Sequence, residues 1–142
     1  MNEKILIVED HPLHMKLMEL TLRAKDYVLL RATDGEEALD MAIREQPDLI
    51  LMDIRLPKMD GFEVTKRLRE KPELSHTPII ALTAHAMVGD RESVIRSGCD
   101  AYLSKPVDTR ELPGLVAEML LKRRQEAPTI SGNQDEKENP RN

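Results

Sequence analysis

Aromatic residues are scarce in this sequence: its 142 residues include one phenylalanine, two tyrosines and no tryptophan. An excess of basic charge is missing as well, because 26 acidic residues outnumber 21 basic ones and the net charge is −5. Proteins that bind nucleic acids neutralise phosphates with lysine and arginine, and many stack bases on aromatic rings. We therefore do not expect direct nucleic-acid binding.

The sequence also lacks long apolar runs and paired cysteines. No stretch approaches the roughly 20 apolar residues of a membrane-spanning helix, so membrane insertion is not expected. Residues 1–4 lead into an apolar segment without the pattern of a cleavable signal peptide. The single cysteine, Cys99, cannot form an internal disulfide, which favours a cytoplasmic location. We expect it to be a small, partly buried apolar side chain, because no activating base is adjacent.

What the sequence does contain is five apolar segments that alternate with five amphipathic ones. The predicted strands are 4–8, 27–32, 48–52, 78–82 and 101–104. Strands and helices that alternate with short connections predict an α/β fold with a five-stranded parallel sheet and helices on both faces. Right-handed crossovers favour the flavodoxin-like strand order 2-1-3-4-5.

The first three helices are predicted from apolar spacing and capping residues. In the first helix, apolar residues at steps of three and four are expected to face the core. They are Leu13, Leu17, Leu20 and Ala24. Thr33–Glu36 has the form of a capping box and predicts the start of the second helix. Asp60 is expected to cap the third helix, in which Val64 and Leu68 are one turn apart.

The last two helices have clear boundary residues. The fourth is expected at about 87–97 and to end at Gly98, a residue type typical of left-handed helix termini. The fifth contains Pro113 in its first turn, where proline is tolerated. Its predicted core-facing residues are Leu112, Leu115, Val116 and Met119.

The apolar pattern stops after about Arg124. The remaining residues are polar and include almost no large apolar side chain, which is typical of a flexible segment. We therefore expect one domain over residues 1–125 and a polar flexible tail over residues 126–142.

Chemically functional residues follow several of the predicted strands. Glu9 and Asp10 follow the first strand, Asp53 follows the third, and Thr83 and Lys105 follow the fourth and fifth. Ligands of open α/β sheets bind beyond the carboxyl ends of the strands, where the strand order reverses. In the order 2-1-3-4-5 the first and third strands are neighbours, so we expect the three carboxylates to converge.

Three carboxylates in one place repel one another unless a cation neutralises them. Oxygen ligands without histidine or cysteine favour a hard ion, Mg²⁺ or Mn²⁺. The hydroxyl of Thr83 and the ammonium of Lys105 suit an anion that shares this metal. The set therefore predicts a phosphoryl-transfer site in which Asp53 is the nucleophile.

Four motifs in this order resemble the receiver domain of response regulators in two-component signalling. They are "VED" (8–10), "LMDIRLPKMDG" (51–61), "LTA" (82–84) and "YLSKP" (102–106), and the resemblance covers about residues 3–124. It implies that Asp53 accepts a phosphoryl group from a sensor histidine kinase or a histidine phosphotransfer protein. It also implies that Mg²⁺ is held by Glu9, Asp10, Asp53 and the backbone carbonyl of Arg55.

The resemblance assigns further roles around this site. Thr83 would hydrogen-bond the phosphoryl group, Lys105 would pair with it, and Tyr102 would be the switch aromatic that moves inward with Thr83. Pro106 matches a proline that is commonly cis in the family. The side chains expected to border the site are Arg55, Ala84, His85 and Pro106. By hypothesis, Arg55 and His85 restrict the attacking water and alter the lifetime of the phosphoryl group.

Phosphorylation would then change the binding of a partner. The face expected to switch is formed by the predicted fourth helix, the fifth strand and the fifth helix, and it would bind a downstream protein or a second copy of the chain. The first helix, near His14 and Leu17, is the expected docking surface for the phosphodonor.

Several alternatives remain open from the sequence. The chain is also consistent with a receiver cut from a longer regulator with an output domain. A phosphorylation-independent binding module should lack Asp53, Lys105 or the acidic pair, and all are present. A hydrolase of the haloacid type expects an acid at the position of Arg55. Glu9 or Asp10 is also a candidate cap for the first helix. The alternative for Tyr102 is an ordinary half-buried residue of an edge strand. His11 and His14 are interpreted as surface histidines rather than metal ligands.

Overall fold

The computed structural model describes residues 2–23, 25–84, 92 and 94–126. Five strands form one parallel sheet: β1 (Lys4–Val8), β2 (Val28–Ala32), β3 (Leu49–Asp53), β4 (Ile79–Thr83) and β5 (Ala101–Ser104). Their order is β2-β1-β3-β4-β5. The predicted order is confirmed, and each strand boundary lies within one residue of its prediction.

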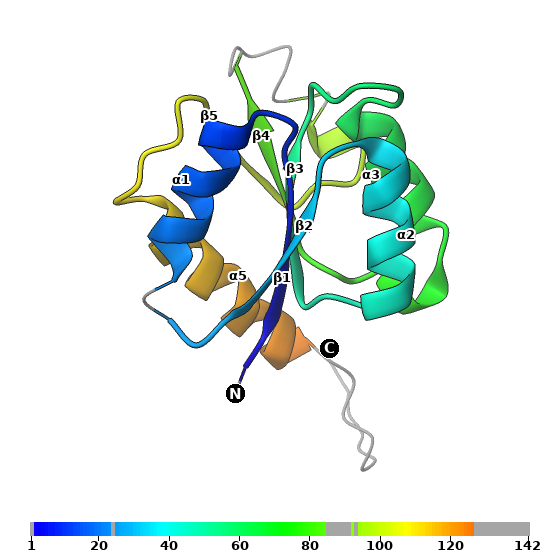
Figure 1. Cartoon of the computed structure of the whole chain (residues 1–142). Helices are drawn as coiled ribbons and strands as arrows, with labels where there is room; N and C mark the ends of the chain where they lie inside the picture. The colour runs from blue at the N-terminus through cyan, green and yellow to red at the C-terminus, as the bar shows by residue number, and fades with distance from the viewer. Residues whose placement is uncertain (1, 24, 85–91, 93, 127–142) are drawn as a thin grey trace.

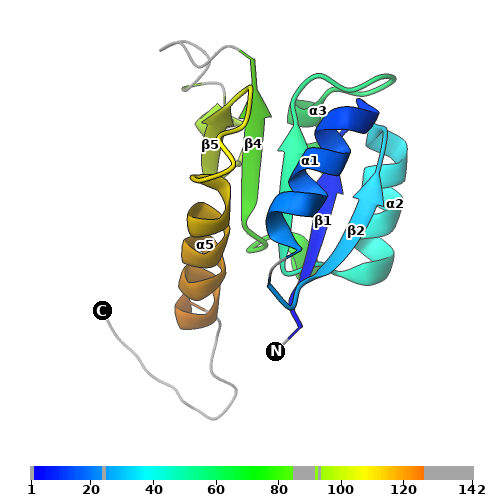
Figure 2. The same cartoon turned by 60° about the vertical axis from the view of Figure 1, so that its left-hand side comes forward.

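Helices cover both faces of the sheet. The helical elements are α1 (Pro12–Leu22), α2 (Gly35–Glu45), α3 (Gly61–Arg69), the short 3₁₀ helix η1 (Pro72–Leu74) and α5 (Leu112–Glu126). Figures 1 and 2 show α1 and α5 on one face and α2 and α3 on the other. The predicted fourth helix lies largely outside the described residues, although residues 94–96 are helical. Gly98 follows them with φ of 106°, as predicted for a helix terminus.

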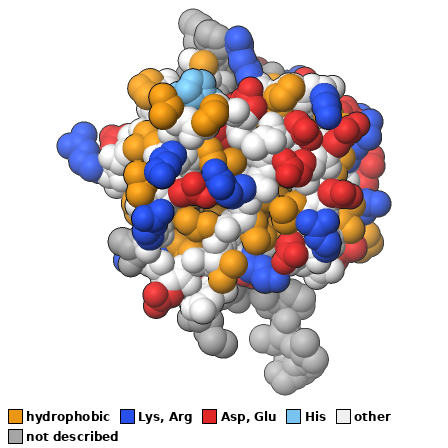
Figure 3. Space-filling view, viewed as in Figure 1, with side chains coloured by type: hydrophobic (Ala, Val, Ile, Leu, Met, Phe, Trp, Pro, Cys, Tyr) orange, Lys and Arg blue, Asp and Glu red, His pale blue; other side chains and the backbone are white. Residues whose placement is uncertain are grey.

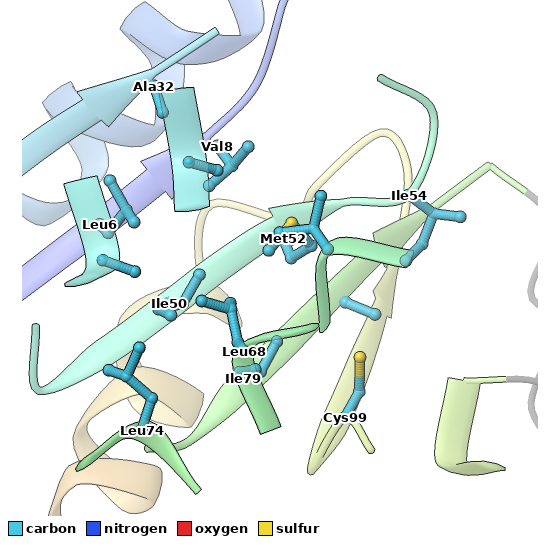
Figure 4. Packing of buried hydrophobic residues seen from close by; sticks show 14 of the residues in the cluster. Leu6, Val8, Ala32, Ile50, Met52, Ile54, Leu68, Leu74, Ile79 and Cys99 are labelled. Atoms are coloured by element: carbon cyan, nitrogen blue, oxygen red, sulfur yellow. The ribbon is translucent and has the colours of Figure 1, made fainter. Parts of the chain in front are cut away.

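The core consists of two apolar layers, one on each side of the sheet, because successive side chains of a strand point to opposite faces. On one side the strand residues Ile5, Ile7, Leu49 and Leu51 pack against α1 and α5. On the other side Leu6, Val8, Ile50 and Met52 pack against α2 and α3 (Figure 4). All eight are fully buried. The continuous apolar runs of β1 and β3 therefore reflect burial on both faces.

The face of α1 that packs on the sheet differs from the predicted one. Leu13, Leu17 and Leu20 are 74%, 40% and 47% exposed, whereas the buried residues of α1 are Met15, Met18 and Leu22. The second set has the same three- and four-residue spacing, so periodicity alone could not choose between them. Ala24 lies outside the described residues. Figure 3 shows hydrophobic side chains next to a histidine over the beginning of α1.

Of the two helix caps predicted from the sequence, one is confirmed and the other lies one residue later than predicted. The Asp60 prediction is confirmed, because its Oδ1 accepts a hydrogen bond from the Glu63 N–H at 2.9 Å. The cap of α2 is Asp34 rather than Thr33. Its Oδ1 accepts from the Glu37 N–H at 2.8 Å, and Glu37 Oε1 accepts in return from the Thr33 N–H at 2.7 Å. The capping pair therefore lies one residue later than predicted, and its return hydrogen bond comes from Thr33, the residue before the cap, rather than from Asp34 as in a standard capping box.

The predicted packing of α5 is confirmed. Leu112, Val116 and Met119 are buried, and Leu115 packs partly buried against the same layer. Pro113 lies in the first turn. Residues 127–142, most of the predicted tail, lie outside the described residues, so the domain boundary stays a prediction. Among the described residues, no helix is both long and apolar enough to cross a membrane.

Candidate functional site

The acidic residues meet at the carboxyl ends of β1 and β3, as their positions after these strands predict. Asp53 is the last residue of β3, and Glu9 directly follows β1. One carboxylate oxygen from each of Glu9, Asp10 and Asp53 lies within 4.8 Å of the others. Glu9 and Asp53 are buried, whereas Asp10 is exposed. The cluster therefore consists of two buried carboxylates and a third that faces solvent.

Lys105 extends from the end of β5 into this cluster. Its Nζ donates a hydrogen bond to Asp53 Oδ2 at 3.0 Å. The same Nζ lies 2.9 Å from Glu9 Oε1, in an ion pair. The side chains of Lys105, Glu9 and Asp53 are only 17%, 0% and 4% exposed. One ammonium therefore compensates the charge of two buried carboxylates, which could not otherwise be desolvated together.

The second oxygen of Asp53 is held by the backbone. Its Oδ1 accepts a hydrogen bond from the Arg55 N–H at 3.0 Å. The Ile54 N–H donates to the Leu82 carbonyl at 3.1 Å and fixes the chain immediately after β3. Each oxygen of Asp53 thus has its own hydrogen-bond donor, which fixes the orientation of the carboxylate. The side chain of Arg55 is exposed.

Burial and neighbouring charges alter the titration of this pair. Burial raises the pKa of Asp53, the Glu9 charge raises it further, and the hydrogen bond from Lys105 opposes both. Burial alone would lower the pKa of Lys105, but its interactions with Glu9 and Asp53 outweigh that effect and raise it. Lys105 is therefore charged at neutral pH.

The cluster fits a hard divalent cation. Glu9 Oε1 is buried and, among the described residues, has no hydrogen-bond partner, because its contact with Lys105 lacks hydrogen-bond geometry. Lys105 Nζ lies 2.9 Å from this oxygen, but its single positive charge is shared with Asp53, so the three acids keep a net negative charge that a divalent cation would neutralise. Three carboxylates supply the oxygen ligands that Mg²⁺ and Mn²⁺ prefer.

Gly61 is a site residue to which sequence reasoning gave no role. A Cβ on Gly61 would lie 2.6 Å from the carbonyl oxygen of Asp53 and 2.8 Å from the Cα of Ile54. Only glycine therefore allows α3 to begin directly against the end of β3. The available signal was its position after the capping Asp60, but the close contact depends on the tertiary fold.

The two histidines of α1 lie beside the cluster without joining it. His11 caps α1, because its Nδ1 accepts from the Leu13 N–H at 3.2 Å, so the alternative that Glu9 or Asp10 caps this helix is wrong. The rings of His11 and His14 stack with centroids 4.2 Å apart, and His14 Nδ1 lies 3.7 Å from Glu9 Oε2. The cluster of possible metal ligands found in the described residues includes neither histidine.

The remaining predicted residues surround the site from β4 and β5. Thr83 is buried at the end of β4, and Ala84 after it is exposed. Tyr102 is partly buried on β5, opposite Ala81 in the strand register. The peptide bond between Lys105 and Pro106 is cis, as predicted. His85 lies outside the described residues.

Burial also explains why the thiol of Cys99 is unreactive. Its side chain is buried, more fully than the predicted partial burial. Its Sγ lies 3.7 Å from Thr65 Oγ1 and accepts a hydrogen bond from Ser97 Oγ at 3.6 Å. Burial raises the pKa of the thiol. Cys99 is therefore a poor nucleophile and plays no part in the site.

Comparison with known proteins gives one consistent match. The family model described as the response regulator receiver domain matches residues 5–117. The polar-differentiation response regulator DivK of Brucella ovis is 50% identical over 107 residues, which are 75% of this chain and 87% of that protein.

Solved structures with the same fold are also similar in sequence. A putative response regulator from Chloroflexus aurantiacus is 34% identical with a TM-score of 0.81, over 85% of this chain and 99% of the other. The receiver domain of the sensor histidine kinase PA1611 from Pseudomonas aeruginosa is 38% identical with a TM-score of 0.78, over 84% and 98%. That receiver has a magnesium ion coordinated in its active-site cleft.

Proposed function

This chain belongs to the response regulator receiver domain family, and from that membership we propose that it accepts a phosphoryl group on Asp53. The observation that carries the proposal is the arrangement of the Asp53 carboxylate. One oxygen is bound to Lys105, the other to the Arg55 N–H, and Glu9 and Asp10 lie beside it. A buried carboxylate held in this way is an oriented nucleophile.

The acidic cluster is the proposed magnesium site. Glu9, Asp10 and Asp53 would hold Mg²⁺, or Mn²⁺, together with the backbone carbonyl of Arg55. Three carboxylates that share one ammonium support this assignment, as does the magnesium in the related PA1611 receiver. The bound ion would neutralise charge that develops on the phosphoryl oxygens.

The proposed reaction uses a phosphohistidine as donor. A carboxylate oxygen of Asp53 attacks phosphorus, a new O–P bond forms, and the P–N bond to the donor imidazole breaks. The bonding electrons stay on the imidazole nitrogen. Lys105 and Thr83 contact the transferred oxygens, and attack by water on the aspartyl phosphate later returns inorganic phosphate. We further propose that Arg55 and His85 restrict this water and alter the lifetime of the phosphoryl group, and that Ala84 and Pro106 also border the site.

Phosphorylation is proposed to change a binding surface. Thr83 and Tyr102 would move together and alter the face formed by the predicted fourth helix, β5 and α5, which then binds a downstream protein or a second copy. The donor, a sensor histidine kinase or a histidine phosphotransfer protein, would dock on α1. A pocket beside the site supports this docking surface, because it is lined by His14, Leu17, Lys105 and Pro106. A cytoplasmic location stays a prediction, as does the role of residues 126–142.

Intact-mass measurement tests the proposal directly. Wild type and Asp53→Asn are incubated with acetyl phosphate, with Mg²⁺ or with a chelator. We expect wild type to gain one phosphoryl group only with Mg²⁺, and Asp53→Asn to gain none. A folded, Mg²⁺-binding wild type that gains no mass from acetyl phosphate or from a phosphorylated histidine phosphotransfer protein would contradict the proposal. That result would favour the phosphorylation-independent binding module.

A further inference from the structure

We propose that the beginning of α2 positions the loop between β3 and α3 (residues 54–60), and that Gly35 is a positioning residue for the magnesium site. The inference rests on the proposed function, because this loop carries Arg55, whose carbonyl is a proposed metal ligand. Gly35 itself contacts neither metal nor phosphoryl group. Its effect would pass through the loop.

The loop is closed at its base. The Gly61 N–H donates to the Ile54 carbonyl at 2.8 Å, so the chain returns to the point at which it left β3. Ile54 is fixed in turn to Leu82 of β4, and the Arg55 N–H is fixed to Asp53. The two ends of the loop are therefore fixed, and a displacement of the loop has to change the backbone of the residues between these ends.

The tip of the loop is in an unfavourable conformation. The Met59 N–H donates to the Pro57 carbonyl at 2.7 Å, which makes a three-residue turn. Lys58 at its centre has φ of 71°, in the left-handed region that is uncommon for residues with a side chain. Turns of this kind are rare and persist only where the surrounding structure holds them.

The beginning of α2 supplies that support. A Cβ on Gly35 would lie 2.8 Å from the Met59 carbonyl oxygen and 2.9 Å from the Met59 Cβ, so the loop backbone rests on the helix at a distance that only glycine permits. On the outer side, Lys58 Nζ lies 3.6 Å from Asp34 Oδ2 and 3.8 Å from Glu36 Oε1. Figure 1 shows the loop next to the end at which α2 begins.

Displacement of Met59 should therefore weaken magnesium binding. An added methyl group at Gly35 would meet the Met59 carbonyl oxygen, the Met59 Cβ and, at 2.9 Å, the Cγ2 of the buried Val64. The two Met59 atoms move only with the backbone, so relief of these contacts requires a shift of the loop. Because both ends of the loop are fixed, the shift reaches the segment that contains Arg55. Residues that orient metal ligands typically change metal affinity by about 10- to 100-fold when they are mutated.

The test compares Gly35→Ala with the matched control Gly114→Ala, in which a Cβ meets nothing within 4 Å. The Mg²⁺ dissociation constant is measured by calorimetry under conditions where urea unfolding shows that each variant is folded. We expect Gly35→Ala to bind Mg²⁺ about tenfold more weakly and Gly114→Ala to bind it like wild type. Loss of stability alone would not change the affinity of the folded protein. Wild-type affinity in folded Gly35→Ala would overturn the inference.

Lys58→Gln provides a second variant without a steric clash. Removal of a cation near a cation site would by itself strengthen Mg²⁺ binding, whereas loosening of the loop should weaken it by about twofold. Weaker Mg²⁺ binding by Lys58→Gln supports the inference, and unchanged or stronger binding overturns it. This test applies even if Gly35→Ala does not fold. A wild type without Mg²⁺ binding would overturn the proposed function and this inference together. Wild-type binding with unaffected variants would overturn the inference alone.

Discussion

At the scale of single residues, the charge of Asp53 opposes the stability of the folded protein. Burial and the neighbouring Glu9 raise its pKa above the ordinary value, although Lys105 partly compensates. A carboxyl group whose pKa is raised in the folded state stabilises that state fully only below its unfolded pKa. This contribution is lost as the pH rises through the folded pKa. At neutral pH, the ionised carboxylate of Asp53 is therefore a source of instability at the site.

Asp53→Asn removes this charge and keeps the shape of the side chain. Without Mg²⁺, we expect the variant to have a larger free energy of unfolding than wild type at pH 7. The difference should shrink as the pH falls through the raised pKa of Asp53, because the carboxyl group of wild type then becomes protonated and loses its charge. Urea unfolding in the presence of a chelator, at several pH values, measures this. A variant that is less stable than wild type at pH 7, or whose advantage grows in acid, would contradict the expectation.

At the scale of elements, α1 shows how one amphipathic pattern can be divided between two roles. Met15, Met18 and Leu22 pack against the sheet, while Leu13, Leu17 and Leu20 are exposed at comparable spacing. The exposed set lies on the helix that also contributes His14 and Leu17 to the pocket beside Lys105. Exposed apolar side chains next to a functional site are typical of binding surfaces. The exposed stripe is therefore consistent with the proposed docking of a phosphodonor.

The same kind of substitution should have very different effects on stability on the two faces of α1. Met18→Ala removes a side chain that is 1% exposed and should lower the free energy of unfolding by about 2–4 kcal/mol. Leu13→Ala changes a side chain that is 74% exposed and should alter it by less than about 0.5 kcal/mol. Urea unfolding of both variants provides the comparison. Equal destabilisation would mean that α1 packs through the face expected from the sequence.

Local patterns predicted the elements better than their contacts. The strands could be predicted because each is a short apolar run of neighbouring residues. Right-handed crossovers then gave the strand order, and the residues after β1 and β3 gave the acidic cluster. The packing face of α1 did not, because two apolar stripes compete and only the sheet selects one. The roles of Gly35 and Gly61 depend on backbone from elements distant in the sequence, and nothing local indicates that contact.

At the scale of the whole molecule, the opposite ends of the sheet serve different purposes. The acidic cluster lies at the carboxyl ends of the strands, and Arg69 joins several segments near the amino end of β4. Its guanidinium donates to the carbonyls of Leu74, Thr77 and Gly98 at 2.7–3.0 Å. It also forms an ion pair with Asp100 at 2.7 Å. The Asp100 carboxylate in turn accepts a hydrogen bond from the N–H of Ile79, the first residue of β4. This single side chain therefore connects α3, η1 and the entry to β5.

Arg69→Gln should separate stability from function. Loss of the guanidinium leaves several carbonyls without their donor, so we expect the free energy of unfolding to fall by about 2–4 kcal/mol. Arg67→Gln, on the same helix, removes only a surface ion pair with Glu63 and should change it by less than about 1 kcal/mol. Because Arg69 contacts no residue of the acidic cluster, both folded variants should bind Mg²⁺ with the affinity of wild type. Calorimetry and urea unfolding on the same samples measure the two quantities. Weaker Mg²⁺ binding in folded Arg69→Gln would show that the two ends of the sheet are energetically coupled.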